Sequence, residues 1–422
     1  MRLSRCSQFE WLQIAYTALQ LFTRNGLQNH AAATAFYFLL SATPLLLLLS
    51  YALQVLGRVA EQSVPASILM AALYTQLHLD SLTDYGFIPR HAQLTAGGIG
   101  LLTLILSSRG LVNAVQGAFN IVFPDRNKRN MVVSWILPLL ILPLLLLLMG
   151  LGALAQLTLA FLAQNDFIGT GNATLLQVLN SLFAFFILWA VLFAAYWQLP
   201  RHHPPARHAA WFALFAAVSL VLLFSLFGAF FKLENYHNLY GALGGVVFVL
   251  IGAYFAFLLL YLWAQALYAY GKADLTALEK LFLAGSGEGA SKLERFVFSD
   301  TGRLLDKYGR VYPPGHVLIQ EGDNSQTAYF LYAGRAMATK RTDAGPSRLG
   351  ELAEGQLFGE MAYLLKEKRT ASVVAESEIT VLELPPRILE ALMQQSAPLS
   401  RQIIGTLCQR LERMNMARQA QP

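Results

Sequence analysis

The sequence predicts an α-helical polytopic membrane bundle of about six transmembrane helices, followed by a compact β domain with flanking helices. Of the 422 residues, 55% are hydrophobic and only 13% are charged, whereas about a quarter of a typical soluble domain is charged. Residues 1–272 contain 13 Lys and Arg against 7 Asp and Glu, and residues 273–422 contain 18 of each. We therefore expect a membrane domain at 1–272, a linker at 273–292 and a soluble domain at 293–422.

Long uncharged runs predict the membrane helices, because about 20 apolar residues cross a bilayer as a helix. The third run is longer than one crossing requires, and its prolines predict a tilt or a break. Residues 8–23 have the apolar spacing of a helix that lies at the membrane surface. The expected spans are 31–56, 94–122, 131–163, 174–199, 209–231 and 241–270.

The connecting segments differ in their content of Lys and Arg. The N-terminal segment and the segments 124–130 and 200–208 are basic, whereas 164–173 contains no Lys or Arg and 232–240 contains a single Lys. Because basic loops stay on the cytoplasmic side, we expect both termini in the cytoplasm. The net charge of +6 therefore indicates membrane topology rather than a nucleic-acid partner.

Arg109 falls near the middle of the second expected span, where a cation costs about 2.5–3.5 kcal/mol on insertion scales. It either faces the interior of the bundle, with Asn113, Gln116 and Asn120 on a neighbouring helix face, or the span is broken and Arg109 lies at an interface. The sequence leaves both alternatives open.

A second polar group precedes the sixth expected span. Its residues either line a polar cavity in the membrane or lead into a helix whose glycines allow close packing, and close packing is preferred. The residues are Asn235, Tyr236, Asn238 and Tyr240, followed by Gly241, Gly244 and Gly245.

The sequence predicts no catalytic residue, no metal and no cofactor. His202, His203 and His208 cluster in one loop, but no carboxylate or cysteine accompanies them at ligand spacing, so a solvated basic loop is preferred. The two cysteines, Cys6 and Cys408, cannot form a disulfide framework. No paired carboxylates, Ser-His-Asp arrangement or Walker loop stands out, so an enzyme is the less favoured interpretation.

Three strings in the first 272 residues are distinctive: HAAATAFYFLLSATPLLLLL at 30–49, SSRGLVNAVQGAFNIVF at 107–123 and NYHNLYGALGGVVFVLIGAYFAFLLLYLWAQ at 235–265. They resemble the YihY/BrkB family of bacterial inner-membrane proteins, which implies a multi-pass protein of the bacterial inner (plasma) membrane. The family commonly ends its last span with Gly-Ala-Glu, where this chain has Gln265, so a role for that acidic residue does not carry over. Older family labels name a ribonuclease and a virulence factor, and no residue pattern here supports either.

The soluble domain begins after an amphipathic helix and a Gly/Ser linker at 272–292. Short runs separated by turn residues predict compact β structure, and residues 386–417 return to helical spacing. The expected strand-forming runs are 315–323, 327–339, 369–376 and 379–385.

The segment LFGEMAYLLKEKRTASV, residues 357–373, has the residues of a phosphate site. Gly359 lets the backbone approach a ligand, and a short helix starting at Glu360 would point its first amides at an anion. Arg369 can close over the same point and bind a phosphate in a bidentate manner. Glu360 can accept a hydrogen bond from a sugar hydroxyl. The sequence therefore predicts a site for a small phosphate with a sugar hydroxyl beside it.

This segment resembles the phosphate-binding cassette of cyclic-nucleotide-binding domains, and the resemblance covers about 300–417 and implies a β-roll. It implies that Gly359 and Glu360 contact the ribose and that the amide of Ala362 and Arg369 contact the cyclic phosphate. Thr370 does not decide between cAMP and cGMP. Leu407 and Leu411 are candidates for a lid over the base. The expected cassette is Phe358, Gly359, Glu360, Met361, Ala362, Arg369 and Thr370.

The expected function is therefore that of an inner-membrane protein in which a cytoplasmic domain senses cAMP or cGMP and regulates a transport or channel-like activity. One alternative is a membrane scaffold that binds a partner and carries a regulatory β-roll or one that has lost its ligand, and a ribonuclease is a distant one. The expected partners are the lipid bilayer and a cyclic nucleotide, with a homo-oligomer also considered and no nucleic acid.

Overall fold

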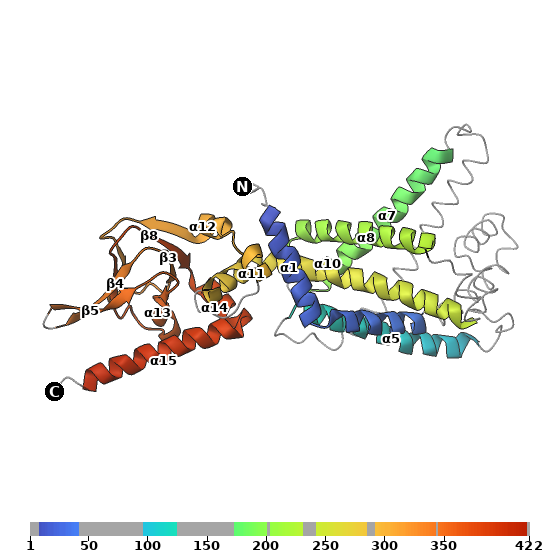
Figure 1. Ribbon diagram of the computed structural model, residues 1–422. Helices are drawn as coiled ribbons and strands as arrows, with labels where there is room; N and C mark the ends of the chain where they lie inside the picture. The colour runs from blue at the N-terminus through green and yellow to red at the C-terminus, as the bar shows by residue number, and fades with distance from the viewer. Residues whose placement is uncertain are drawn as a thin grey trace. The chain divides into compact units, whose positions relative to one another are not determined.

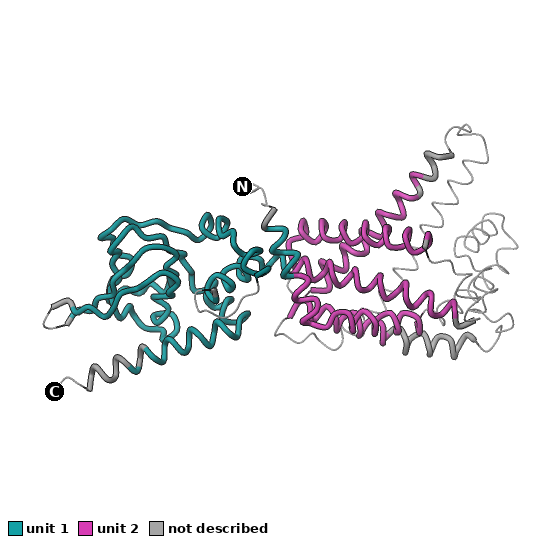
Figure 2. The backbone as a smooth tube through the Cα atoms, viewed as in Figure 1, with its two compact units in different colours: residues 1–17, 269–422 teal, residues 18–268 magenta. Residues whose placement is uncertain are grey.

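The computed structural model describes residues 8–41, 96–124, 173–200, 203–230, 242–284, 292–342 and 345–419 (Figure 1). These residues form two compact units (Figure 2). One unit lies within residues 18–268 and is helical wherever it has regular structure. The other combines parts of residues 1–17 and 269–422, and it contains two β-sheets with helices around them.

The helices of the 18–268 unit are apolar along most of their length. Three stretches in the described part are long and apolar enough to cross a membrane, at Ser181–Gln198, Ala206–Ala229 and Gly244–Leu283. They coincide with the fourth, fifth and sixth expected spans. The third expected span lies outside the described residues, so the number six stays a prediction. The helices are the last part of α1 (Gln8–Arg24), residues 27–41, α5 (Ala96–Val122), α7 (Ala173–Gln198), α8 (Ala206–Phe230) and the first part of α10 (Ala242–Ala284).

Hydrogen bonds from aromatic side chains join some of these helices. The hydroxyl of Tyr196 on α7 donates to the carbonyl oxygen of Leu260 on α10 at 2.8 Å, and Nε1 of Trp263 on α10 donates to Oγ of Ser219 on α8 at 2.9 Å. Tyr196 is fully buried, so without this acceptor its unpaired hydroxyl would destabilise the fold. These bonds fix α7 and α8 against α10.

Helix α10 is longer than the sequence analysis predicts. The expected sixth span and the expected amphipathic helix after it form one helix, Ala242–Ala284, of 43 residues. Gly271 does not interrupt it, because strong helix formers follow that glycine. The last turns present Leu278 and Phe282 to the core of the C-terminal unit, where both are buried.

In the described part of the C-terminal unit, eight strands form two four-stranded sheets, and every pair is antiparallel. The strand order is β1-β8-β3-β6 in one sheet and β2-β7-β4-β5 in the other. This arrangement confirms the predicted β-roll. The strands are β1 (Gly309–Tyr312), β2 (Val317–Ile319), β3 (Ala328–Ala333), β4 (Ala336–Thr342), β5 (Gly345–Leu352), β6 (Leu357–Phe358), β7 (Ser372–Ala375) and β8 (Ile379–Leu384).

Two apolar cores lie on opposite faces of the first sheet. On β8, Ile379 and Val381 belong to the core that both sheets share, whereas Leu382 and Leu384 belong to a core with helices. This alternation follows from the two-residue period of a strand. The helices of the second core are the end of α10, α12 (Gly302–Tyr308), α14 (Pro386–Gln395) and α15 (Ala397–Gln419).

Ion pairs fasten the last part of α10 to the helices that follow it. The carboxylate of Asp274 lies 2.9 Å from Arg303 and 2.5 Å from Lys307, both on α12. Lys280 pairs with Glu294 on α11, which spans Lys292–Val297. The end of α10 is therefore an integral part of the C-terminal unit.

Candidate functional site

Gly359 occupies the turn between β6 and α13 (Glu360–Leu365), as the sequence predicts. Its backbone is left-handed, with φ +75° and ψ 1°, a conformation that disfavours residues with a Cβ. A Cβ built at this position would lie 2.8 Å from Nη1 of Arg369 and 2.9 Å from Cδ1 of Ile319. Glycine is therefore required here both by the backbone angle and by the close approach of a guanidinium.

Arg369 is buried beside this turn, with 4% of its surface exposed. Its Nη1 donates to the carbonyl oxygen of Gly359 at 2.6 Å, and its Nη2 donates to the carbonyl oxygen of Thr327 at 2.5 Å and to Oγ of Ser325 at 3.1 Å. Its Nε is buried and has no hydrogen-bond partner among the described residues. The guanidinium thus lies at the predicted position, although protein oxygens already accept from both of its outer nitrogens.

The backbone holds Arg369 in place from the other side. Its amide donates to the carbonyl oxygen of Asp323 at 2.9 Å, and its carbonyl oxygen accepts from the amide of Gly322 at 2.9 Å. Burial lowers the pKa of the Arg369 guanidinium, while the nearby Tyr329, Asp323 and Glu360 act in the opposite direction. An arginine stays protonated despite such a shift, so the site retains one fixed positive charge.

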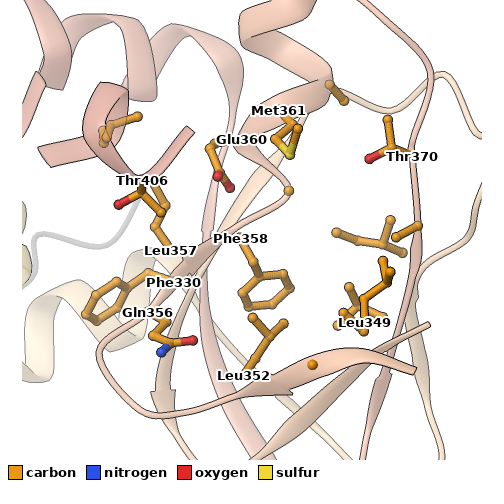
Figure 3. A pocket seen from close by; sticks show the side chains of 18 of the residues that line it. Phe330, Leu349, Leu352, Gln356, Leu357, Phe358, Glu360, Met361, Thr370 and Thr406 are labelled. Atoms are coloured by element: carbon orange, nitrogen blue, oxygen red, sulfur yellow. The ribbon is translucent and has the colours of Figure 1, made fainter. Parts of the chain in front are cut away.

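Glu360 begins α13 and is 1% exposed. Figure 3 shows its carboxylate reaching into the space between Thr406 and Met361. A buried carboxylate at this place can accept a hydrogen bond from a ligand hydroxyl. Its charge also favours the protonated form of Arg369.

A pocket of about 840 Å³ joins these groups, which is within the size range of small-molecule sites. All seven residues of the expected cassette line it, so the fold brings them together as the sequence analysis requires. The side chains of Phe330, Leu352 and Phe358 form an apolar part of the wall (Figure 3). The pocket therefore combines an apolar surface with a buried cation and a buried carboxylate.

Several lining residues come from elements that the sequence analysis does not assign to the site. Strand β4 contributes Lys340, and β5 contributes Arg348 and its neighbours from 347 to 352. Lys340 and Arg348 add two positive charges to the lining, and Glu351 of β5 adds one negative charge. In the sequence, only the positive charge of Lys340 and Arg348 points to a role at an anion site. Strand β5 itself is hard to predict, because it lacks the alternating apolar pattern of a strand.

The last helix lines the pocket with a different face from the one expected. Leu407 is half-buried and is not among the lining residues, and the side chain of Leu411 lies outside the described part, so a lid made by these leucines stays a prediction. The 3–4 residue spacing of a helix face connects the residues that do line the pocket. From α15 these are Leu399, Gln402, Ile403, Thr406 and Gln409.

The polar residues of the second expected span lie on one continuous helix. Helix α5 runs through Arg109, which removes the alternative of a span broken at that residue. Arg109, Asn113, Gln116 and Asn120 are separated by four, three and four positions, so they share one helix face rather than neighbouring faces. Nε2 of Gln116 is buried without a hydrogen-bond partner in the described structure.

The second predicted polar group cannot be assessed in the same way. Tyr236, Asn238 and Tyr240 lie outside the described residues, as does Asn235. The glycines that follow, Gly244 and Gly245, are buried at the start of α10. Their burial agrees with the packing alternative for these two positions.

Two buried polar contacts in the 18–268 unit escape the sequence analysis. The hydroxyls of Thr34 and Tyr261 lie 2.7 Å apart, and both side chains are fully buried. Asn25 donates to Oε1 of Gln265 at 3.3 Å, and Gln265 is fully buried with its Nε2 lacking a hydrogen-bond partner in the described part. The sequence offers one sign of such a contact: Gln265 is a polar residue inside an otherwise apolar run.

Among the residues that the structure describes, no three His, Cys, Asp or Glu side chains come together, and the preference for a solvated basic loop at 200–208 stays a prediction. Nδ1 of His203 lies 2.6 Å from the carbonyl oxygen of Trp197. His202 falls outside the described residues.

Comparison with known proteins gives a match for each part of the chain. The profile of the family described as Virulence factor BrkB matches residues 18–280, and that of the Cyclic nucleotide-binding domain matches residues 309–396. A UPF0761 membrane protein of Azotobacter vinelandii is 31% identical over 189 residues, which are 44% of this chain and 45% of that protein. The cAMP-dependent protein kinase regulatory subunit of Pyricularia oryzae is 38% identical over 90 residues, 21% of this chain and 23% of that protein.

Among solved structures, the Catabolite Activator Protein of Thermus thermophilus is 25% identical, with a TM-score of 0.27. It covers 33% of this chain, and the match covers 61% of that chain. The chain spans less than half the length of the two curated relatives.

The matched ranges confirm the predicted fusion of a membrane domain and a cyclic-nucleotide-binding domain. The first match alone, residues 18–280, includes more than half of the 422 residues. The chain therefore belongs to the membrane-protein family described as Virulence factor BrkB, and it carries a cyclic nucleotide-binding domain at residues 309–396.

Proposed function

We propose that this protein of the bacterial inner membrane senses cAMP or cGMP through its C-terminal domain on the cytoplasmic side, and that the nucleotide regulates a transport or channel-like activity of the membrane half. The observation that carries the proposal is the position of Arg369. Its buried guanidinium lies beside the left-handed Gly359, at the start of α13 and on the wall of an 840 Å³ pocket.

The pocket has a suitable group for each part of a cyclic nucleotide. The phosphate is assigned to Arg369 and to the amide of Ala362 in the first turn of α13, where helix amides favour an anion. The ribose is assigned to Gly359 and to the carboxylate of Glu360. The base then extends toward α15, which offers Gln402 and Thr406 as hydrogen-bonding side chains.

The alternative of a β-roll that has lost its ligand is less well supported. A buried guanidinium nitrogen without an acceptor costs free energy, and Nε of Arg369 is such an atom in the described structure. A phosphate oxygen in the adjoining pocket would supply an acceptor. Since both outer nitrogens already donate to protein oxygens, nucleotide binding would also rearrange the contacts of Arg369 with Gly359 and Thr327.

Regulation would proceed through α10. Phe282, near the end of this helix, lines the pocket and packs on Phe330 with ring centroids 4.4 Å apart. The same helix contains the apolar stretch Gly244–Leu283. A nucleotide that binds one arrangement of Phe282 and its neighbours more tightly would shift the equilibrium of the membrane half toward that arrangement.

Titration calorimetry on the full chain in lipid nanodiscs tests the sensing function. We expect cAMP or cGMP to bind the native chain and binding to be lost in Arg369→Ala. Arg387→Ala, which removes an exposed arginine from α14, serves as the matched control and should bind as the native chain does. Native-like affinity in Arg369→Ala would refute the assigned site.

The regulated output needs its own experiment. The polar face of α5, with Arg109, Asn113 and Gln116, supports a transport pathway rather than a scaffold. Ion flux into proteoliposomes should change when the nucleotide is added and should fall in Arg109→Ala. Flux that responds to neither would favour the scaffold alternative, in which the membrane half binds a partner protein.

A further inference from the structure

Helix α11, Lys292–Val297, has two chemically different faces. On its inner face Val297 is 1% exposed and Glu294 pairs with Lys280 of α10. On its outer face Leu293 is 58% exposed and Phe296 is 61% exposed. The cations Lys292 and Arg295 are also exposed. The outer face therefore combines two large apolar side chains with two positive charges.

Helix α11 is held against α1. Nε2 of Gln13 on α1 donates to the carbonyl oxygen of Val297 at 3.1 Å. The ring of Tyr16 meets Phe298, the residue after α11, edge to face with centroids 6.1 Å apart. Figure 1 shows the two helices side by side. The position of α11 is thus tied to that of α1.

Helix α1 in turn marks the end of the apolar run of α10. The ring of Trp11 lies 6.3 Å from that of Tyr270, centroid to centroid. Residues 242–271 of α10 contain no charged side chain, and Lys272 is the first. Since Trp and Tyr gather at the boundary between membrane and water, Trp11 and Tyr270 mark this boundary. Helix α11 contacts α1 through Gln13 and, through Glu294 and Lys280, the charged part of α10 that follows Tyr270.

We propose that the outer face of α11 rests on the surface of the bilayer, with Leu293 and Phe296 in the interfacial layer and with Lys292 and Arg295 beside anionic lipid headgroups. Short amphipathic helices with basic and apolar residues bind membranes in this way. A second copy of the chain fits this face less well, because lysine is depleted at the core of protein interfaces. The proposal rests on the membrane position of α10 and not on nucleotide binding.

The test compares two positions of equal exposure by spin labelling. Phe296→Cys places a label on α11, and Val311→Cys places one on β1, where the native valine is 62% exposed. Both are made in a chain in which Cys6 and Cys408 are replaced by Ser. The full chain is reconstituted in nanodiscs of phosphatidylcholine with a minority of phosphatidylglycerol. Accessibility of each label to oxygen, which enters lipid, and to a water-soluble nickel chelate is then measured.

We expect the ratio of oxygen to nickel accessibility to be several-fold higher at 296 than at 311. Equal ratios at the two positions would overturn the proposal. Protection of the label at 296 from both reagents, together with magnetic coupling between labels of different chains, would show a protein partner instead and would also overturn it.

The role of the two cations is tested in the same labelled chain. Replacing Lys292 and Arg295 by Glu should lower the ratio at 296, whereas Arg387→Glu on α14 should leave it unchanged. Omitting phosphatidylglycerol should also lower the ratio in the native background. A ratio that stays the same after charge reversal and after removal of the anionic lipid would refute the assignment of headgroups to Lys292 and Arg295.

Discussion

The guanidinium of Arg369 occupies the space that a side chain at position 359 would need, and it donates to the carbonyl oxygen of that same glycine at 2.6 Å. The two residues are ten positions apart in the sequence, at opposite ends of the segment that contains α13. Their contact closes this segment into one loop. The shape of the predicted phosphate site therefore depends on both residues together.

Gly359→Ala should destabilise the C-terminal unit by about 1–3 kcal/mol, because alanine disfavours the left-handed angle and its Cβ meets the guanidinium. The matched control is Gly405→Ala in α15, where an added Cβ has no neighbour within 4 Å. That change should stabilise the unit by about 0.5–1 kcal/mol. Thermal unfolding of the full chain measures both. An equal effect of the two substitutions would contradict the close approach described at Gly359.

Glu360→Gln should weaken the binding of a cyclic nucleotide only when the ribose carries its 2′-hydroxyl. A hydrogen bond to a charged acceptor contributes about 1.5–3 kcal/mol, so the loss in affinity should be roughly tenfold or more. A 2′-deoxy nucleotide should bind native protein and Glu360→Gln with similar affinity. Calorimetric titration of both proteins with both nucleotides gives the coupling energy between the Glu360 carboxylate and the 2′-hydroxyl. A coupling energy near zero would show that Glu360 does not bind the ribose.

Asp274→Asn should loosen α12 from α10, because Asp274 pairs with both Arg303 and Lys307. The pair is partly exposed, so we expect a loss of only about 0.5–1 kcal/mol. Thermal unfolding compares this variant with Asp306→Asn, which changes an exposed carboxylate on α12. Equal stability of the two variants would show that the ion pairs contribute nothing.

The stability difference between native chain and Asp274→Asn should also depend on pH. The hydrogen bond from Lys307 to Asp274 raises the pKa of Lys307 above its ordinary value of 10.5. A group whose pKa is raised by folding stabilises the protein fully below its unfolded pKa. The difference should therefore be constant between neutral pH and pH 9 or so. As the pH rises through the raised pKa of Lys307, it should fall to the part that the Arg303 pair contributes.

Phe282→Ala should destabilise the C-terminal unit by about 3–5 kcal/mol, the usual cost of deleting a buried ring. Phe282 is 4% exposed and packs on Phe330. The control Ile404→Ala removes a side chain that is 50% exposed on α15, and it should change stability by less than about 0.5 kcal/mol. Chemical unfolding of the full chain distinguishes the two. A small effect at Phe282 would mean that the end of α10 is not part of this core.

The strands that the sequence predicts are those with an alternating apolar pattern. Strands β2, β3, β7 and β8 fall inside expected runs, because such short apolar runs report buried positions. Strand β5, Gly345–Leu352, is not predicted, because it has glycine, proline and polar residues and only long-range pairing with β4 makes it a strand. The helix of the sixth expected span continues past residue 270, and a similar reason hides this in the sequence. Gly271 and the first charges after it look like a boundary, although packing of Leu278 and Phe282 continues the helix.

The candidate site also has a part that the sequence predicts and a part that it does not. Its cassette is local in sequence, so the order of Gly359, Glu360 and Arg369 suffices to predict a phosphate-binding turn. The wall made by α15 is not local. Gln402 and Thr406 have the composition of a solvated helix face, and only the folded chain shows that they line the pocket.

Because α10 is one uninterrupted helix, Phe282 has a fixed rotational position about the helix axis relative to the apolar residues earlier in the same helix. One residue inserted after Gly271 would turn Phe282 by about 100° about the helix axis, whereas seven inserted residues would restore its orientation to within roughly 20°. An insertion or deletion between Gly271 and Phe282 therefore preserves the direction of Phe282 only if it adds or removes nearly whole turns.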